Sequence, residues 1–431
     1  MAPVKLILHF DINQTLILED KAGGDSFEDA LNLIVCKSAF VRIKGGGGSA
    51  QEAKEATSVD QLEWMNGHPI DGSAVDPNKV VCTSWEWPPG CVPFHRVALL
   101  KGVGRAFTEK GNPGHPLRGV YKRLREAMTI PETDEPVDAR LATDCGKFWL
   151  VVPSFFEMLA GLAMTLRNFS LVFRTYGSEA AKVVHALNAF AEGKHPFARG
   201  VPSLASDPEH AWTGRYQDDG KYTLTRTAGV ATTALDETAA VKRLEDRDSD
   251  GPSAHAVVDD YGWWKKNYHM PEAGKPLWID LADKRCHHVF FDDNIHNSDA
   301  DSIVAVRVRD RETAPFTPLS GFRALHLQGV FLVRVPTMLA ILDDTWFLAR
   351  LQDAEQKKAD LQKGGRLAVI CRGRHSALDI KVDATKKPLT AASTSARSSH
   401  ERRREFTDPY PSAATSAPSA RAQAPVAALS S

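Results

Sequence analysis

The sequence of 431 residues has few cysteines, no long hydrophobic run and almost no net charge. Its six cysteines form no CxxC pair, which excludes a zinc ribbon and a small disulfide-stapled scaffold. No stretch reaches about 18 consecutive apolar residues, and the apolar run near the N-terminus is too short for a signal peptide. A formal net charge of −1 predicts no strong attraction to nucleic acid or anionic membranes. We therefore expect a cytoplasmic protein with reduced thiols and no membrane span.

What is present is enough apolar material for a sizeable core, since 43% of the residues are hydrophobic. Short apolar runs that end at polar residues predict strands at 4–10, 170–173, 289–291, 303–308 and 330–335. Apolar residues at helical spacing predict helices over 26–37, 117–128, 153–166, 180–190, 236–247 and 337–351. This alternation predicts an α/β, Rossmann-like fold with a mainly parallel sheet and helices on both faces.

The same patterns divide the chain into a core, two insertions and a tail. Residues 1–20, 150–195 and 258–365 carry the core elements. Residues 21–149 are irregular and rich in Trp, Pro and Gly, which predicts an insertion that could form a cap. Residues 196–257 are polar and poorly periodic, which predicts a second insertion with a hairpin near Gly220. Residues 384–431 have too little apolar content to offset ordering entropy, so we expect a disordered tail.

Polar side chains follow three of the predicted strands directly. Asp11 follows the first strand, Thr175 the second, and Asp292 and Asp293 a later one. The carboxyl ends of parallel strands meet at one edge of a sheet, so residues more than 280 positions apart can converge there. This edge is the predicted functional site.

With these residues the sequence resembles the haloacid dehalogenase-like (HAD) superfamily. The DxDxT motif of that family is matched by the segment DINQT at 11–15, its lone Ser or Thr after a strand by Thr175, and its acidic pair by Asp292 and Asp293. A lysine belongs between the last two motifs, and the sequence offers four, at Lys265, Lys266, Lys275 and Lys284. We favour Lys275, because Lys284 lies so close to the next strand that it fits the approach turn.

The resemblance implies a Mg²⁺-dependent phosphatase or phosphotransferase. Asp11 would attack phosphorus and form an aspartyl-phosphate intermediate. Mg²⁺ would bind Asp11, the backbone carbonyl of Asn13, and Asp292 or Asp293. Thr175 and Lys275 would bind the phosphoryl oxygens. The implied partner is a phosphorylated small molecule or a phosphoprotein.

Asn13 departs from the pattern of the family's phosphatases, in which a second Asp stands at this position. That Asp protonates the leaving group and later activates water, whereas an amide has no comparable proton. The backbone carbonyl is unaffected, so metal binding should survive. Because general acid/base catalysis contributes about 10² to 10⁴ in rate, Asn13 predicts a slow enzyme. The alternative is a binding or regulatory protein that has kept the fold and lost turnover.

Other short patterns point less strongly to chemistry. Cys286, His287 and His288 are adjacent on a strand, so their side chains alternate between faces and do not readily share one ion. The glycines at 45–48 lack the Lys and Ser/Thr of a phosphate-binding P-loop. The segment 263–268 interleaves Trp and Tyr with Lys and could bind nucleic acid, but packing of an insertion against the core is favoured. We therefore do not expect nucleic acid as a partner.

Overall fold

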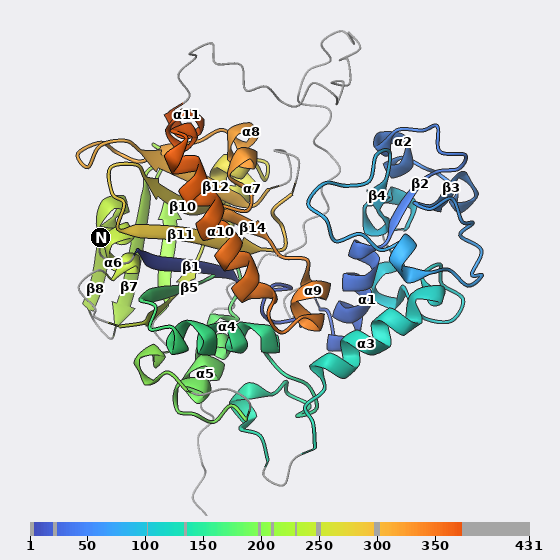
Figure 1. The fold of residues 1–431 in the computed structure, drawn as a ribbon, viewed down its shortest axis with the longest axis horizontal. Helices are drawn as coiled ribbons and strands as arrows, with labels where there is room; N and C mark the ends of the chain where they lie inside the picture. The colour runs from blue at the N-terminus through green and yellow to red at the C-terminus, as the bar shows by residue number, and fades with distance from the viewer. Residues whose placement is uncertain are drawn as a thin grey trace, which may run out of the picture.

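The fold centres on an eight-stranded β-sheet (Figure 1). The computed structural model describes residues 4–19, 24–100, 102–132, 136–196, 200–207, 211–228, 231–246, 251–296 and 302–372. The strands of this sheet are β1 (Lys5–Asp11), β5 (Phe169–Thr175), β6 (Trp212–Tyr216), β7 (Tyr222–Ala228), β8 (Ala231–Asp236), β9 (Ser253–Val258), β11 (Cys286–Asp292) and β14 (Leu332–Arg334). Their order is β14-β11-β1-β5-β9-β6-β7-β8. Neighbouring strands are parallel from β14 to β6 and antiparallel from β6 to β8, which confirms the predicted α/β class.

The strand order reverses direction at β1. The chain runs from β1 to β5 and then to β9 on one side, and later returns to β11 and β14 on the other side. Open α/β sheets bind ligands outside the carboxyl ends of the strands at such a reversal. Asp11, Thr175 and Asp292 are the last residues of β1, β5 and β11. The topology therefore gathers these three residues at the place where a ligand site is expected.

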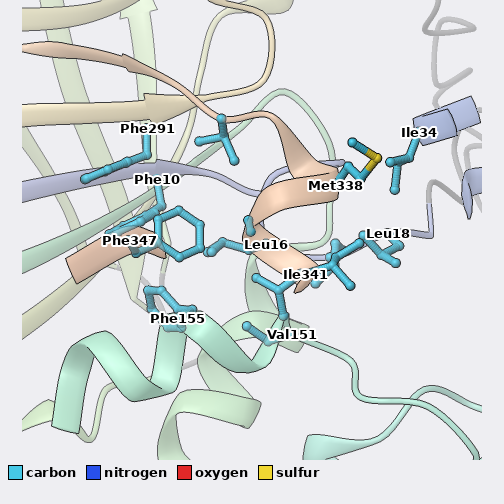
Figure 2. Close-up of a cluster of buried hydrophobic side chains, with 14 of the residues drawn as sticks. Phe10, Leu16, Leu18, Ile34, Val151, Phe155, Phe291, Met338, Ile341 and Phe347 are labelled. Atoms are coloured by element: carbon cyan, nitrogen blue, oxygen red, sulfur yellow. The ribbon is translucent and has the colours of Figure 1, made fainter. Parts of the chain in front are cut away.

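One face of the sheet is covered by helices. They are α4 (Pro153–Met164), α5 (Ala180–Ala191), α9 (Thr337–Leu342) and α10 (Trp346–Lys363). Figure 2 shows Phe10 of β1 pointing toward these helices. Its ring lies 4.8 Å from that of Phe291, 5.1 Å from Phe155 and 5.5 Å from Phe347 between centroids. Such aromatic pairs add about 0.5 to 1.5 kcal/mol each beyond burial, so this cluster fixes β1 and β11 against the helices.

The other face of the sheet is covered by a helix and a second sheet rather than by helices alone. The helix is α6 (Glu237–Glu245). The second sheet has the order β10-β12-β13, with β10 (Lys275–Asp280), β12 (Val304–Arg309) and β13 (Thr317–Pro318). The strand predicted at 303–308 belongs to this small sheet. Three short helices adjoin it: α7 (Tyr261–Lys266), α8 (Gly321–Ala324) and α11 (Arg366–Arg372).

The described residues of 24–149 form a lobe beside the sheet, on the right in Figure 1. It contains α1 (Phe27–Ser38), α2 (Ala50–Lys54), α3 (Arg118–Met128) and a small sheet of β2 (Phe40–Ile43), β3 (Leu62–Trp64) and β4 (Val92–Pro93). These strands have only two to four residues, too few for a periodicity to be read. Ile34 of α1 and Leu18 lie beside Met338 and Ile341 of α9 (Figure 2). The lobe therefore shares one hydrophobic core with the sheet.

In the range 196–257, predicted as a second insertion, the described strands β6 to β9 extend the main sheet. The hairpin near Gly220 joins β6 to β7, with Gly220 at φ +77°. β9 runs parallel to β5, so the predicted division at 257 falls within this strand. The boundary was missed because β9 has the sequence SAHAVV, which lacks a long apolar run.

The helix predicted at 337–351 is two helices, α9 and α10, separated by residues 343–345. Asp343 accepts hydrogen bonds from the backbone N–H and the hydroxyl of Thr345, which favours a turn over a continuous helix. No helix in the described part of the chain is long and apolar enough to cross a membrane. The predicted disordered tail at 384–431 lies outside the described residues.

Candidate active site

Three carboxylates meet at the carboxyl edge of the main sheet. Asp11 ends β1, Asp292 ends the neighbouring β11, and Asp293 follows. One oxygen of each lies within 4.8 Å of the other two. The three residues are 5%, 0% and 8% exposed. Among the described residues this is a cluster able to hold a metal ion, and its oxygen ligands suit a hard divalent cation such as Mg²⁺.

Lys275 joins this cluster from the second sheet. It is the first residue of β10, it is 2% exposed, and its amine donates hydrogen bonds to Asp11 and, at 3.1 Å, to Asp292. Gly274 permits this placement, since a Cβ at this position would lie 2.0 Å from the carbonyl oxygen of Ile303. The structure therefore brings together Asp11, Asp292, Asp293 and the lysine that the sequence favoured.

The other three lysine candidates lie elsewhere. Lys265 and Lys266 are exposed on α7, where Lys266 forms an ion pair of 3.4 Å with Asp218. Lys284 is exposed in the connection between β10 and β11.

Burial disfavours the negative charge of the carboxylates, and a neighbouring cation offsets this effect. Burial raises the pKa of Asp11 well above its usual value, although the charge of Lys275 opposes this shift. Burial likewise raises the pKa of Asp292, and the neighbouring Asp293 adds to the effect. Burial opposes the charge of Lys275, but the two carboxylates outweigh it and raise the pKa of the amine. Lys275 contacts two of the three buried carboxylates, and the set of three carboxylate oxygens fits a divalent cation.

Asn13 lies in the loop after β1, two residues after Asp11. The carbonyl of Ile12 accepts the backbone N–H of Leu16 at 2.9 Å, and Gln14 has a positive φ of 59°. Thr15 accepts the backbone N–H of Asp293 at 3.1 Å, which ties the loop to the end of β11. The side-chain oxygen of Asn13 is buried and has no hydrogen-bond partner. An unpaired buried amide is costly, so this oxygen is suited to bind a ligand or water.

Thr175 lies at the same edge, but its hydroxyl is bonded to the backbone of the following loop rather than to the carboxylates. It is buried at the end of β5, next to β1. Its hydroxyl oxygen accepts the backbone N–H of Gly177 at 2.8 Å, which leaves its proton available to donate.

Two charged residues near the site were not predicted. Asp259 forms a fully buried ion pair with Arg174, with bonds of 2.5 and 3.0 Å, and its backbone N–H donates to the backbone carbonyl of Thr175 at 2.7 Å. The signal for Asp259 was present, because Asp259 and Asp260 follow β9 as an acidic pair. Lys37, in the last turn of α1, reaches Asp293 at 2.9 Å. No strand-end pattern marks this lysine.

The histidines at 287–288 and the tryptophans at 263–264 form packing contacts. His287 contacts the carbonyl of Val330, whereas His288 contacts His9 and Glu245, so the two adjacent rings face different surroundings. Trp264 is buried and stacks on Tyr176 at 5.4 Å, and Trp263 stacks on Tyr216 at 5.6 Å. These contacts attach α7 to the core near the site.

The fold and the site define the class of the protein in outline. It is an α/β protein with a mostly parallel sheet, and its sheet edge carries a buried group of three carboxylates and a lysine. Comparison of the chain with protein-family models, curated protein sequences and solved structures finds no match.

Proposed function

We propose that this chain is a HAD-like, Mg²⁺-dependent phosphoryl-transfer enzyme, in its simplest form a phosphatase, with Asp11 as the nucleophile. The observation that carries the proposal is the meeting of Asp11, Asp292 and Asp293 within 4.8 Å, with Lys275 bonded to the first two. The order of these residues along the chain matches the motifs of the HAD superfamily. Their position where the sheet order reverses supports the same reading.

In the proposed reaction a carboxylate oxygen of Asp11 attacks the phosphorus of a phosphate monoester. The bond from phosphorus to the leaving oxygen breaks, and the phosphoryl group remains on Asp11 as an acyl phosphate. Water then attacks phosphorus, the bond to Asp11 breaks, and inorganic phosphate is released. Lys275 and the hydroxyl of Thr175 hold the phosphoryl oxygens during both steps.

The three carboxylates, with the backbone carbonyl of Asn13, would hold a magnesium ion. When bound, it would offset the repulsion between Asp11 and an anionic phosphate. Lys275 alone already neutralises part of that repulsion, because it contacts both Asp11 and Asp292.

Asn13 limits the proton transfers. The leaving oxygen departs without a proton from Asn13 and takes one from solvent, so compounds with good leaving groups react fastest. The unpaired Asn13 oxygen can accept a hydrogen bond from the attacking water, but it cannot remove the proton. This same residue favours the second candidate function, a phosphate-binding or regulatory protein without turnover.

One set of assays separates the two candidates. Wild type, Asp11→Asn and Asn13→Asp are incubated with an activated aryl phosphate, with Mg²⁺ or with EDTA. Asp344→Asn serves as the matched control, since Asp344 is exposed. Mg²⁺-dependent hydrolysis that Asp11→Asn abolishes and Asp344→Asn preserves supports the enzyme. If the wild type is inactive and Asn13→Asp is active, the result supports the second candidate, a binding or regulatory protein without turnover. Activity that survives Asp11→Asn contradicts the mechanism.

A further inference from the structure

One buried arginine connects the strands that carry the site residues. Arg174, next to last in β5, is fully buried and lies opposite Asp11 in the register of β5 and β1. Its guanidinium donates to the carboxylate of Asp259 after β9, to Nδ1 of His9 in β1, and to the backbone carbonyl of Pro276 in β10. These partners belong to both sheets. A single side chain therefore links the main sheet to the second sheet.

The link to the second sheet lies beside Lys275. The carbonyl of Pro276, the next residue, accepts from Arg174 at 2.9 Å, and the carbonyl of Gly274, the preceding residue, accepts the hydroxyl of Tyr216 at 2.9 Å. In the described part of the chain β10 pairs with β12 rather than with a strand of the main sheet. These side-chain bonds therefore hold the backbone on both sides of Lys275 against the main sheet.

The ion pair with Asp259 also holds the end of β5. The backbone N–H of Asp259 donates to the carbonyl of Thr175, the residue after Arg174, at 2.7 Å. The carbonyl of Arg174 accepts the N–H of Ile12, directly after Asp11, at 3.1 Å. Side-chain and backbone bonds together thus fix Thr175 between the end of β9 and the loop after β1.

The geometry of the guanidinium explains why an arginine lies here. Replacement of a buried ion pair by apolar side chains is often neutral or stabilising, so stability alone does not account for this one. Nε and one terminal nitrogen of Arg174 donate to Asp259, which aims the other terminal nitrogen at Pro276 and His9. A lysine has one nitrogen and cannot reproduce this planar arrangement of donors.

We propose that Arg174 is a positioning residue of the active site, which holds the backbone at Thr175 and Lys275 so that both side chains converge on one phosphoryl group. This inference rests on the proposed phosphoryl-transfer function, which assigns those two residues to phosphate. The proposed metal ligands are different residues, namely Asp11, Asp292 and Asp293. Loss of the Arg174 guanidinium should therefore weaken phosphate binding and spare Mg²⁺ binding.

Two titrations of the full chain test this separation. Calorimetry measures the dissociation constant of Mg²⁺ alone, and then that of inorganic phosphate with Mg²⁺ saturating. Arg174→Lys keeps a positive charge beside Asp259 and loses the fixed bond to Pro276. Since a misplacement of about 1 Å can cost about 10²-fold at an active site, we expect phosphate to bind on the order of ten- to a hundredfold more weakly. Mg²⁺ should bind no more weakly than in wild type.

Further variants separate positioning from stability. Arg174→Met combined with Asp259→Leu leaves neither charge buried alone, so it should fold and still lose phosphate affinity. It carries the test if Arg174→Lys is unfolded, which thermal unfolding midpoints reveal. Arg123→Lys changes an exposed arginine of α3 and should bind both ions as wild type does. In a Lys275→Met background the effect of Arg174→Lys should shrink, because part of it acts through the lysine.

Each outcome bears on a stated claim. Equal phosphate binding by wild type and the folded Arg174 variants overturns the inference, and so does wild type that binds no phosphate. A joint loss of Mg²⁺ and phosphate binding, or an undiminished effect in Lys275→Met, also overturns it, because Arg174 would then act on the fold as a whole. Hydrolysis of the aryl phosphate by wild type and Asp11→Asn is measured separately. Phosphate binding that depends on Arg174 without hydrolysis supports the inference and contradicts turnover.

Discussion

Replacement of Lys275 by Met tests whether the carboxylate cluster depends on a cation. The substitution keeps an apolar side chain of similar length and removes the ammonium group from a site that is 2% exposed. Asp11 and Asp292 then lose their common partner, while Asp293 keeps Lys37. Removal of one partner from a buried ion pair costs about 3 to 5 kcal/mol. We expect a loss of that size in the free energy of unfolding, measured by urea denaturation in EDTA.

Magnesium should return part of this stability. An ion that binds only the folded state stabilises it by about 2.7 kcal/mol at a hundred times its dissociation constant. In Lys275→Met, Asp11 and Asp292 no longer have a lysine that competes with the ion, so the gain from Mg²⁺ should exceed that of wild type. Lys284→Met is the control, because Lys284 is exposed, and surface substitutions change stability by about 0.5 kcal/mol or less.

Two results would refute this reasoning. If Lys275→Met unfolds within about 0.5 kcal/mol of wild type in EDTA, as the Lys284 control should, the buried charges do not need the lysine. If the deficit of Lys275→Met is the same with and without Mg²⁺, the three carboxylates do not bind the ion.

Two further predictions concern buried titratable residues outside the carboxylate cluster, Asp259 and His195. Asp259→Asn leaves Arg174 buried without its ion-pair partner, so we expect a loss of about 3 to 5 kcal/mol in urea denaturation; a loss below 1 kcal/mol would contradict this. Burial lowers the pKa of His195 to about 4, so its stabilising contribution is present above the ordinary value of 6.5 and is lost as pH falls toward 4. Wild type should therefore lose about 2 kcal/mol from this group between pH 8 and pH 5, and His195→Phe should remove that part of the pH dependence; parallel pH profiles would count against it.

The central strands and the site at their ends were predictable because burial on both faces leaves an apolar run in the sequence. β1, β5 and β11 are buried along their whole length, and each run stops at the polar residue that enters the site. Lys275 was favoured among four lysines, but the strand that it begins was not predicted. This strand, KPLWID, was missed because it begins with a charged residue and a proline.

Other features depend on contacts that a local pattern cannot carry. Lys37 lies on a helix of the lobe and meets Asp293 only through the packing of that lobe, 256 residues apart in the sequence. The second sheet was missed because its strands pair with each other rather than with the main sheet. Asp259 is different, since it repeats the strand-end signal of Asp292 and was hidden by the assignment of its strand to an insertion.

Asn13 affects both the stability and the chemistry of the site. We expect Asn13→Asp to lower the free energy of unfolding and to raise the rate of hydrolysis. A fourth buried carboxylate beside three others should lower the free energy of unfolding in EDTA and increase the stabilisation by Mg²⁺. The same group would supply the missing proton, so hydrolysis of a phosphate ester with a poor leaving group should rise by about 10² to 10⁴. On this explanation, one buried amide oxygen without a hydrogen bond costs less stability than a fourth buried negative charge. A variant that gains rate and keeps its full metal-free stability would show that charge repulsion does not explain the asparagine.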